Sequence, residues 1–132
     1  MYFEEAITNL RNENPDIDNL ALAHNCGDRD ALDNLPVEII ETVRNLLSEQ
    51  CGDTITLYHG CETDLTTDMI WHENSSFTDE FDIEFAGEDG YIIEAQVPVD
   101  RIKFFLNEER EFVISAGQLD CAVYTVAEYF GL

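Results

Sequence analysis

Glu109 and Glu111 stand two residues apart, directly before an apolar run of β-type residues, Phe112–Ile114. Because side chains of a strand alternate with period two, we expect both carboxylates on one face of a strand. Two acids on one face repel each other, but they would stabilise a positive charge formed beside them. The oxocarbenium-like centre of a breaking glycosidic bond is such a charge. The alternative is a solvated strand edge, where charged residues discourage aggregation.

The composition indicates an acidic globular protein. The chain has 132 residues, 45% of them hydrophobic, so we expect a single domain over 1–132 with a real core. Acidic residues number 29 against 6 basic ones, and the net charge is −23. This charge argues against direct binding to nucleic acid, because phosphates require a basic patch. Docking on a basic surface, adaptation to a salty cytoplasm and plain solubility all remain explanations for the acidity.

The four cysteines show neither C-x-x-C pairing nor a zinc-type spacing with histidine, so we expect reduced thiols and no metal site. No apolar run approaches the length of a membrane span, and the N-terminus lacks the basic region of a signal peptide. We therefore expect a cytoplasmic protein without membrane contact. The oligomeric state stays open.

The segment 1–52 is predicted to be mainly helical. An amphipathic helix is expected over 2–11, followed by a break over Asn12–Asp18 around Pro15 and a short second helix starting near Leu20. The segment 25–34 is polar and indicates a loop or a weak helix. The strongest pattern predicts a helix over 36–50, ended by Gly52, with this apolar stripe: Ile39, Ile40, Val43, Leu46 and Leu47.

The segment 53–132 is predicted to be rich in β-structure. Strands are expected at 54–58, ended by His59–Gly60, and at 75–78, 91–97, 111–115 and 121–126, with 101–106 as a strand or an extended connection. The segment 61–74 is expected to be irregular with a short turn near 69–71, and the acidic run 79–89 favours a strand over a calcium loop. Helices before strands, without βαβ alternation, predict an α+β fold.

Three short motifs follow one another in this framework: Leu57–Gly60 at a strand end, Ser76–Thr78 in a strand, and Glu109–Glu111 before a late strand. In this order they resemble the mono-ADP-ribosyltransferase family, in its toxin-like and bacteriophage-encoded branch. That branch carries an aromatic-Arg-Gly strand, a Ser-x-Ser/Thr strand and a Glu-x-Glu turn. The resemblance covers roughly Ile39 to Gly117. It implies N-terminal helices packed on two small, mainly antiparallel sheets that clasp NAD.

The resemblance implies three catalytic residues. Glu111 would accept a hydrogen bond from the 2′-hydroxyl of the nicotinamide ribose and stabilise the cation as nicotinamide leaves. Glu109 would orient or deprotonate the acceptor. Ser76 would brace Glu111 through a hydrogen bond.

The resemblance also implies NAD-binding roles for Tyr58, His59, Gly60 and Thr78, with the Gly60 backbone facing the nicotinamide amide because only glycine permits so close an approach. His59 departs from the branch, which has arginine there. Arginine offers a permanent bidentate donor, whereas histidine donates conditionally, although the net charge favours its protonated form. A different branch, which includes diphtheria toxin, has Tyr/His-Gly here but a tyrosine in place of Ser76. The alternative for His59 is a strand-end histidine bonded to the backbone.

Two functions follow from these patterns. The first is an NAD-dependent mono-ADP-ribosyltransferase, encoded by a bacteriophage, that modifies a basic host or defence protein in the host cytoplasm. The second is a non-catalytic acidic protein that blocks a nucleic-acid-binding surface by charge mimicry. The scarcity of basic residues favours the second, since only Arg101, Lys103 and Arg110 follow His59. An α+β domain that acts only in assembly is a third reading.

Overall fold

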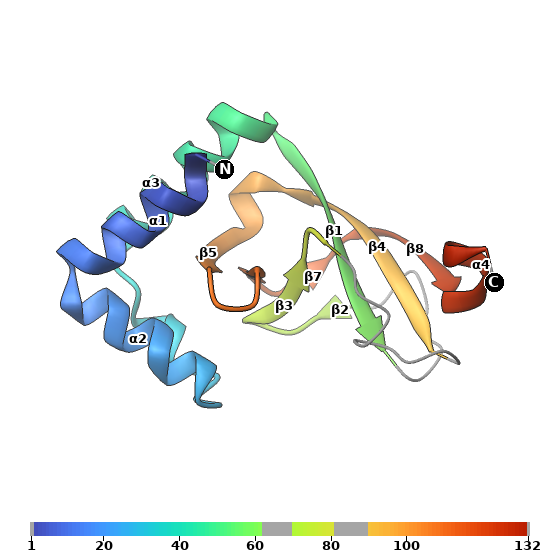
Figure 1. Cartoon of the computed structure of the whole chain (residues 1–132), viewed down its shortest axis with the longest axis horizontal. Coiled ribbons are helices and arrows are strands. Elements are labelled where there is room, and N and C mark those ends of the chain that lie inside the picture. The colour runs from blue at the N-terminus through green and yellow to red at the C-terminus, as the bar shows by residue number, and fades with distance from the viewer. Residues whose placement is uncertain (1, 62–69, 81–89, 132) are drawn as a thin grey trace.

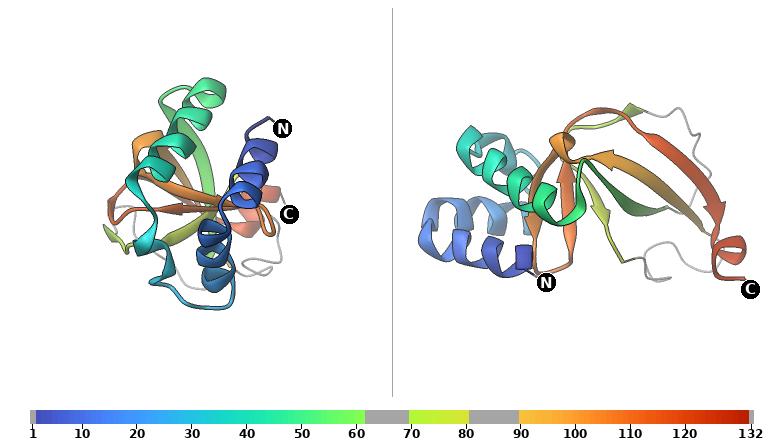
Figure 2. Two further views of the ribbon diagram at one scale, coloured as in Figure 1. Left: turned by 90° about the vertical axis from the view of Figure 1, so that its left-hand side faces the viewer. Right: turned by 90° about the horizontal axis from the view of Figure 1, so that it is seen from above.

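The computed structural model describes residues 2–61, 70–80 and 90–131. The three long helices lie together at one end of the molecule, and the sheet extends from them toward the C-terminus (Figure 1). Figure 2 shows the same grouping from two further sides. The helices are α1 (Tyr2–Glu13), α2 (Pro15–Asn25), α3 (Val37–Cys51) and α4 (Val126–Phe130), with 3₁₀ turns η1 (Ala31–Asn34) and η3 (Val99–Arg101).

The strands form an α+β architecture with the helices, as the sequence predicted. Within the described residues they build one six-stranded antiparallel sheet, in the order β5-β6-β3-β1-β4-β8, and a two-stranded β2-β7 ribbon. The main sheet is therefore larger than the small sheets expected. The strands are β1 (Thr54–Cys61), β2 (Ile70–Trp71), β3 (Ser75–Thr78), β4 (Tyr91–Pro98), β5 (Ile102–Leu106), β6 (Glu111–Ile114), β7 (Gly117–Gln118) and β8 (Asp120–Thr125).

The expected break around Pro15 is wrong, because Pro15 begins α2. Proline fits the first turn of a helix, where its missing N–H has no partner to lose, and acids at Asp16 and Asp18 complement the helix dipole there. Only Asn14 separates α1 from α2. The strong prediction of a helix over 36–50 is confirmed by α3, which ends at Gly52 with a positive φ of 78°.

The predicted strands are confirmed in place but not always in length. His59 and Gly60 do not end β1, because pairing with β4 continues through Cys61 opposite Tyr91. The last predicted strand ends at Thr125, whose side chain caps a short helix that the sequence did not indicate. The expected turn near 69–71 is a strand over Ile70–Trp71. Residues 62–69 of the segment expected to be irregular, and residues 81–89 of the acidic strand expected over 79–89, lie outside the described residues.

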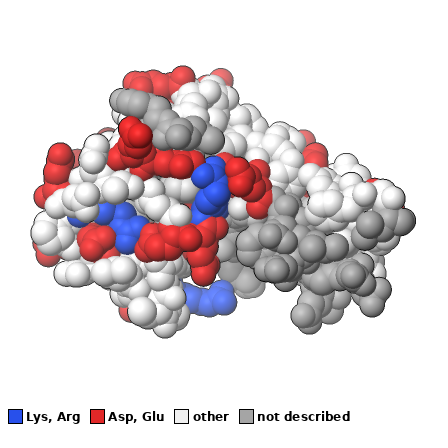
Figure 3. Space-filling view, in the orientation of Figure 1, with Lys and Arg blue, Asp and Glu red and all other residues white. Residues whose placement is uncertain are grey.

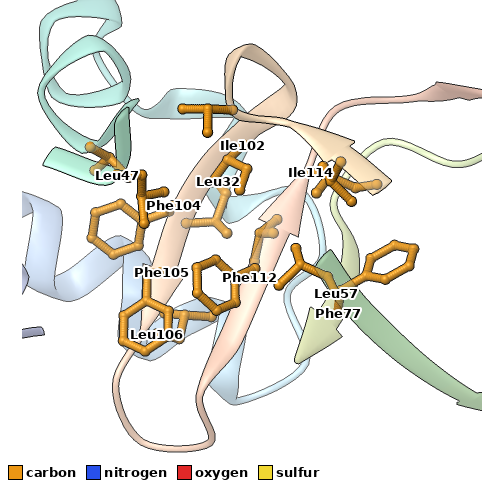
Figure 4. Packing of buried hydrophobic residues seen from close by; sticks show 14 of the residues in the cluster. Leu32, Leu47, Leu57, Phe77, Ile102, Phe104, Phe105, Leu106, Phe112 and Ile114 are labelled. Atoms are coloured by element: carbon orange, nitrogen blue, oxygen red, sulfur yellow. The ribbon is translucent and has the colours of Figure 1, made fainter. Parts of the chain in front are cut away.

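The core lies where the helices meet β5 and β6 (Figure 4). All five residues of β5 are buried, and the rings of Phe3, Phe105 and Phe112 pack with centroids 4.7–6.0 Å apart. The buried ammonium of Lys103 donates to Asn74 Oδ1 at 2.6 Å. This packing fixes β6, and with it the position of Glu111 at its start.

No helix among residues 2–61, 70–80 and 90–131 is both long enough and apolar enough to cross a membrane.

Candidate functional site

One pocket gathers all three sequence motifs. It opens where β1, β3 and the turn between β5 and β6 meet. Its lining contains every residue to which the sequence assigned a catalytic or NAD-binding role, together with Phe77: Tyr58, His59, Gly60, Ser76, Thr78, Glu109 and Glu111. Segments up to 53 residues apart in the sequence (58 to 111) therefore converge on one surface hollow.

The strand register explains this convergence. Tyr58 lies opposite Thr78, and Thr78 lies opposite Glu111. Residues paired across antiparallel strands share a face, so these three side chains form a row across the sheet. Ser76, two residues before Thr78, projects from the same face.

The Glu111 carboxylate is held at both oxygens. Ser76 Oγ donates to Oε1 at 2.9 Å, and His24 Nε2 lies 3.1 Å from Oε2. The Glu111 side chain is 17% exposed and that of His24 is 8% exposed. The hydrogen bond expected between Ser76 and Glu111 is thus present, and a second one comes from a helix.

The sequence analysis missed His24. It stands 87 residues before Glu111, in the last turn of α2. A signal was available, because Ile17, Ala21 and His24 are spaced i, i+4 and i+7 on the buried face of that helix. The break expected around Pro15 shortened the predicted helix and left Ile17 outside it, so the spacing from Ile17 to His24 was not recognised.

Glu109 does not lie on the strand, contrary to the expectation that both carboxylates project from one strand face. Strand β6 begins only at Glu111, and Arg110 before it has a positive φ of 51°, which strand backbone does not adopt. Glu109 is an exposed residue of the turn over 107–110. It reaches the edge of the same pocket from the turn, while Glu111 sits deeper.

The turn over 107–110 is tied to α1 and α2. The guanidinium of Arg11 donates to both carboxylate oxygens of Glu108, one bond measuring 3.0 Å, and Asn25 Nδ2 donates to Glu108 at 2.6 Å. Hydrogen bonding from Arg11 holds the pKa of Glu108 below its ordinary value. Asn107 adds a bond to Thr8 Oγ1 at 3.0 Å.

Arg110 anchors the other side of this turn. It binds Asp79 through Nε at 2.9 Å and through Nη2, and it pairs with Glu4 of α1. Hydrogen bonding of the guanidinium to Asp79 raises the pKa of Arg110 above its ordinary value. Arg110 stands between Glu109 and Glu111 in the sequence, but its guanidinium is paired with Asp79 and Glu4.

The opposite end of the pocket is aromatic. His59 Nδ1 donates to the Ser76 carbonyl at 2.8 Å, and the His59 ring packs against Trp71 and Phe77 at 5.1 and 5.5 Å between centroids. Alternation along β1 places His59 on the face opposite Tyr58. The bond to Ser76 fits the alternative of a backbone-bonded histidine. Hydrogen bonding with Tyr129 raises the pKa of Tyr58 to about 12.

None of the residues lining this pocket is lysine or arginine. The sequence has only six such residues, and none falls in 62–69 or 81–89. On the face shown in Figure 3, acidic side chains lie beside the basic ones near the middle of the helical end, while one basic side chain stands apart at the lower edge. Five of the six bind carboxylates or other oxygen atoms of the protein itself: Arg11, Arg44, Arg101, Lys103 and Arg110.

The described part of the chain offers no metal centre. No group of three or more histidine, cysteine, aspartate or glutamate residues within it is arranged to hold a metal ion. Cys26, Cys51 and Cys121 are reduced thiols.

A scan against protein-family models found no match, and searches of curated proteins and of solved structures found no significant match. The functional assignment therefore depends on the residues of the pocket.

Proposed function

We propose that this protein is an NAD-dependent mono-ADP-ribosyltransferase with the fold of that family. The observation that supports this best is the bond from Ser76 Oγ to Glu111 Oε1 at 2.9 Å, in a pocket that also contains the tyrosine, glycine and second glutamate of the resemblance. A serine bonded to a partly buried carboxylate fixes the direction of its negative charge. Fixed charge of this kind stabilises a cationic transition state better than mobile charge does.

The proposed reaction breaks the bond between the ribose C1′ and the nicotinamide nitrogen. The electron pair of that bond leaves with nicotinamide, and the ribose becomes oxocarbenium-like. Glu111 accepts a hydrogen bond from the 2′-hydroxyl and stabilises this cation. A nucleophilic group of the acceptor then bonds to C1′, and its proton passes to Glu109 at the exposed edge of the pocket.

The acceptor that fits this surface is a basic protein. The net charge of −23 steers the molecule toward positive surfaces, and Glu109 lies where an incoming side chain would arrive. A bacteriophage origin and action in a host cytoplasm belong to the same proposal.

The diphosphate of NAD has no arginine or lysine among the pocket residues to bind it. Neutral donors must serve instead, such as the hydroxyl of Thr78 in the pocket lining. Neutral donors bind anions less strongly than charged donors do. We therefore expect weak binding of NAD, and stronger binding in added salt, which screens repulsion between the diphosphate and the acidic surface.

The test is release of nicotinamide from NAD by the wild type and by Glu111→Gln. The amide keeps the shape of the side chain but removes its negative charge, so we expect a loss of about 10²–10³-fold in turnover. Glu128→Gln, at an exposed position of α4, is the control and should retain wild-type turnover. Unchanged turnover in Glu111→Gln would refute the assignment.

Charge mimicry without catalysis is a second candidate function. It is favoured because five of the six basic side chains bind the protein's own oxygen atoms, which leaves an outer surface dominated by carboxylates. The probe is a basic nucleic-acid-binding domain tested without NAD. This candidate predicts tight binding that weakens with salt and is insensitive to Glu111→Gln. Binding unchanged in high salt would contradict it.

A further inference from the structure

The strongest unexplained contact at the pocket is that of His24 with Glu111. His24 comes from α2, in the helical end of the molecule, whereas the other described residues that bond to this carboxylate or line the pocket come from the strands or the turn. Its side chain is 8% exposed, and Nε2 lies 3.1 Å from Glu111 Oε2. A histidine buried against a carboxylate that the proposed reaction uses requires an explanation.

The geometry fixes which ring nitrogen carries hydrogen. A carboxylate only accepts hydrogen bonds, so Nε2 must be the donor. The other nitrogen, Nδ1, is buried and has no hydrogen-bond partner in the described structure. In the neutral ring, Nδ1 then carries a lone pair that accepts no hydrogen bond. A buried polar atom without a partner lowers the free energy of unfolding. The ring is therefore not placed where it would stabilise the fold most.

We propose that His24 is a positioning residue for Glu111, and this inference rests on the transferase function proposed above. With Ser76 on Oε1 and His24 on Oε2, the carboxylate plane cannot rotate freely. An ionised carboxylate offers about four lone-pair sites. Two sites are used by these donors, so the remaining two stay available for the substrate 2′-hydroxyl in a fixed direction.

The inference gives the helical end a role in the reaction. The α2 helix that carries His24 also carries Asn25, which donates to Glu108 in the turn beside the pocket. Movement of α2 would thus displace both glutamate-bearing segments together.

The experiment compares His24→Leu, which removes the donor, with His24→Gln, whose amide can still donate to Glu111. We expect His24→Leu to lower kcat for nicotinamide release about 10–100-fold, with KM for NAD changed less than about threefold. His24→Gln should recover most of this loss. His24→Leu removes the unpaired Nδ1 but also the donor to Glu111 Oε2, and because these effects oppose each other we expect its melting temperature to change little. His72→Gln, at an exposed histidine, is the matched control and should behave as wild type.

Three results would overturn the positioning role: wild-type kcat in His24→Leu, equal losses in both His24 variants, or a loss of activity that follows a lowered melting temperature. An independent readout is the long-range ¹H–¹⁵N NMR spectrum of the imidazole ring at neutral pH. We expect the hydrogen on Nε2, and a changed Nε2 signal in Glu111→Gln. A hydrogen on Nδ1 with none on Nε2 would refute the contact even if the wild type proved inactive. A wild type that releases no nicotinamide while showing the Nε2 signature would refute the transferase function itself, and with it any catalytic role for His24.

Discussion

The two ends of the pocket are built by different physical means. At the carboxylate end, Glu111 and the turn before it are held by directional bonds from Ser76, His24 and Arg11. At the aromatic end, His59 and Trp71 are held by ring packing and by one bond to the backbone of the neighbouring strand. A hydrogen bond constrains both the distance and the angle between polar atoms, whereas ring packing mainly requires matching shapes. The carboxylate end is therefore suited to orienting reacting groups, and the aromatic end to matching the shape of a ligand.

This comparison predicts that substitutions at the carboxylate end reduce turnover or stability sharply, and that those at the aromatic end do so mildly. After Glu111→Gln, the largest effect is expected for Ser76→Ala, which frees Oε1 of Glu111. We expect turnover of NAD to fall about 10–100-fold. Ser75→Ala is the control, because Ser75 Oγ bonds the His72 carbonyl and not the pocket. Equal losses in the two serine variants would contradict the proposed bracing.

The next effect concerns the stability of the turn. Arg11→Met removes a side chain that binds Glu108 and Asp18 and is itself buried. We expect the free energy of unfolding, measured with urea, to fall by about 2 kcal/mol, the range for hydrogen bonds to charged groups. Arg29→Met, at an exposed residue of the loop after α2, should change it by less than about 0.5 kcal/mol. A similar loss in both variants would mean that net charge, not this ion pair, sets stability.

The pH dependence of the free energy of unfolding tests the ion pair between Arg11 and Glu108 at the carboxylate end. Arg11 lowers the pKa of Glu108 from its ordinary 4.5, so this carboxylate contributes stability above pH 4.5 and loses it as the pH falls through the lower native value. Because Glu108 is partly exposed, we expect wild type to exceed Glu108→Gln by only about 1 kcal/mol at neutral pH. The difference should disappear near pH 2, when both carboxamide and carboxyl are neutral. Urea titrations at several pH values measure it, and a difference independent of pH would contradict the ionic contribution.

The smallest effect is expected at the aromatic end. His59→Phe keeps a ring against Trp71 and Phe77 and loses the bond to the Ser76 carbonyl. We expect a stability loss of about 1 kcal/mol and turnover of NAD within about threefold of wild type. A loss of tenfold or more would show that His59 reaches the substrate, as the arginine of the resembling family does.

The sequence predicted the α+β class and most strands, because hydrophobic periodicity is a local property. Helix α3 shows this: its stripe of apolar residues, ended by Gly52, required no tertiary information. The prediction failed at Pro15, where the same residue type can end a helix or begin one. It also failed at Thr125, since the cap of a short helix looks like the end of a strand until its position is known.

The residues that line the pocket could be predicted from the sequence, but the way in which they are held could not. The order of motifs indicated which segments meet, and strand register explains why Tyr58, Thr78 and Glu111 share a face. The turn conformation at Arg110, with its positive φ, could not be read from a Glu-x-Glu spacing. Nor could the contact of His24, since nothing local in a helix specifies which residue it will meet 87 positions later.

The separation of 87 residues between His24 and Glu111 has a consequence for folding during synthesis. Contacts between residues far apart in the sequence form slowly, because much chain entropy must be lost before they stabilise the fold. Glu111 enters the growing chain after both helices that surround its turn, and the strand that carries it must be complete before α2 can close on it. The contact between His24 and Glu111 would then be one of the last to form during synthesis, and under the proposed transferase function a product truncated before β6 would be inactive.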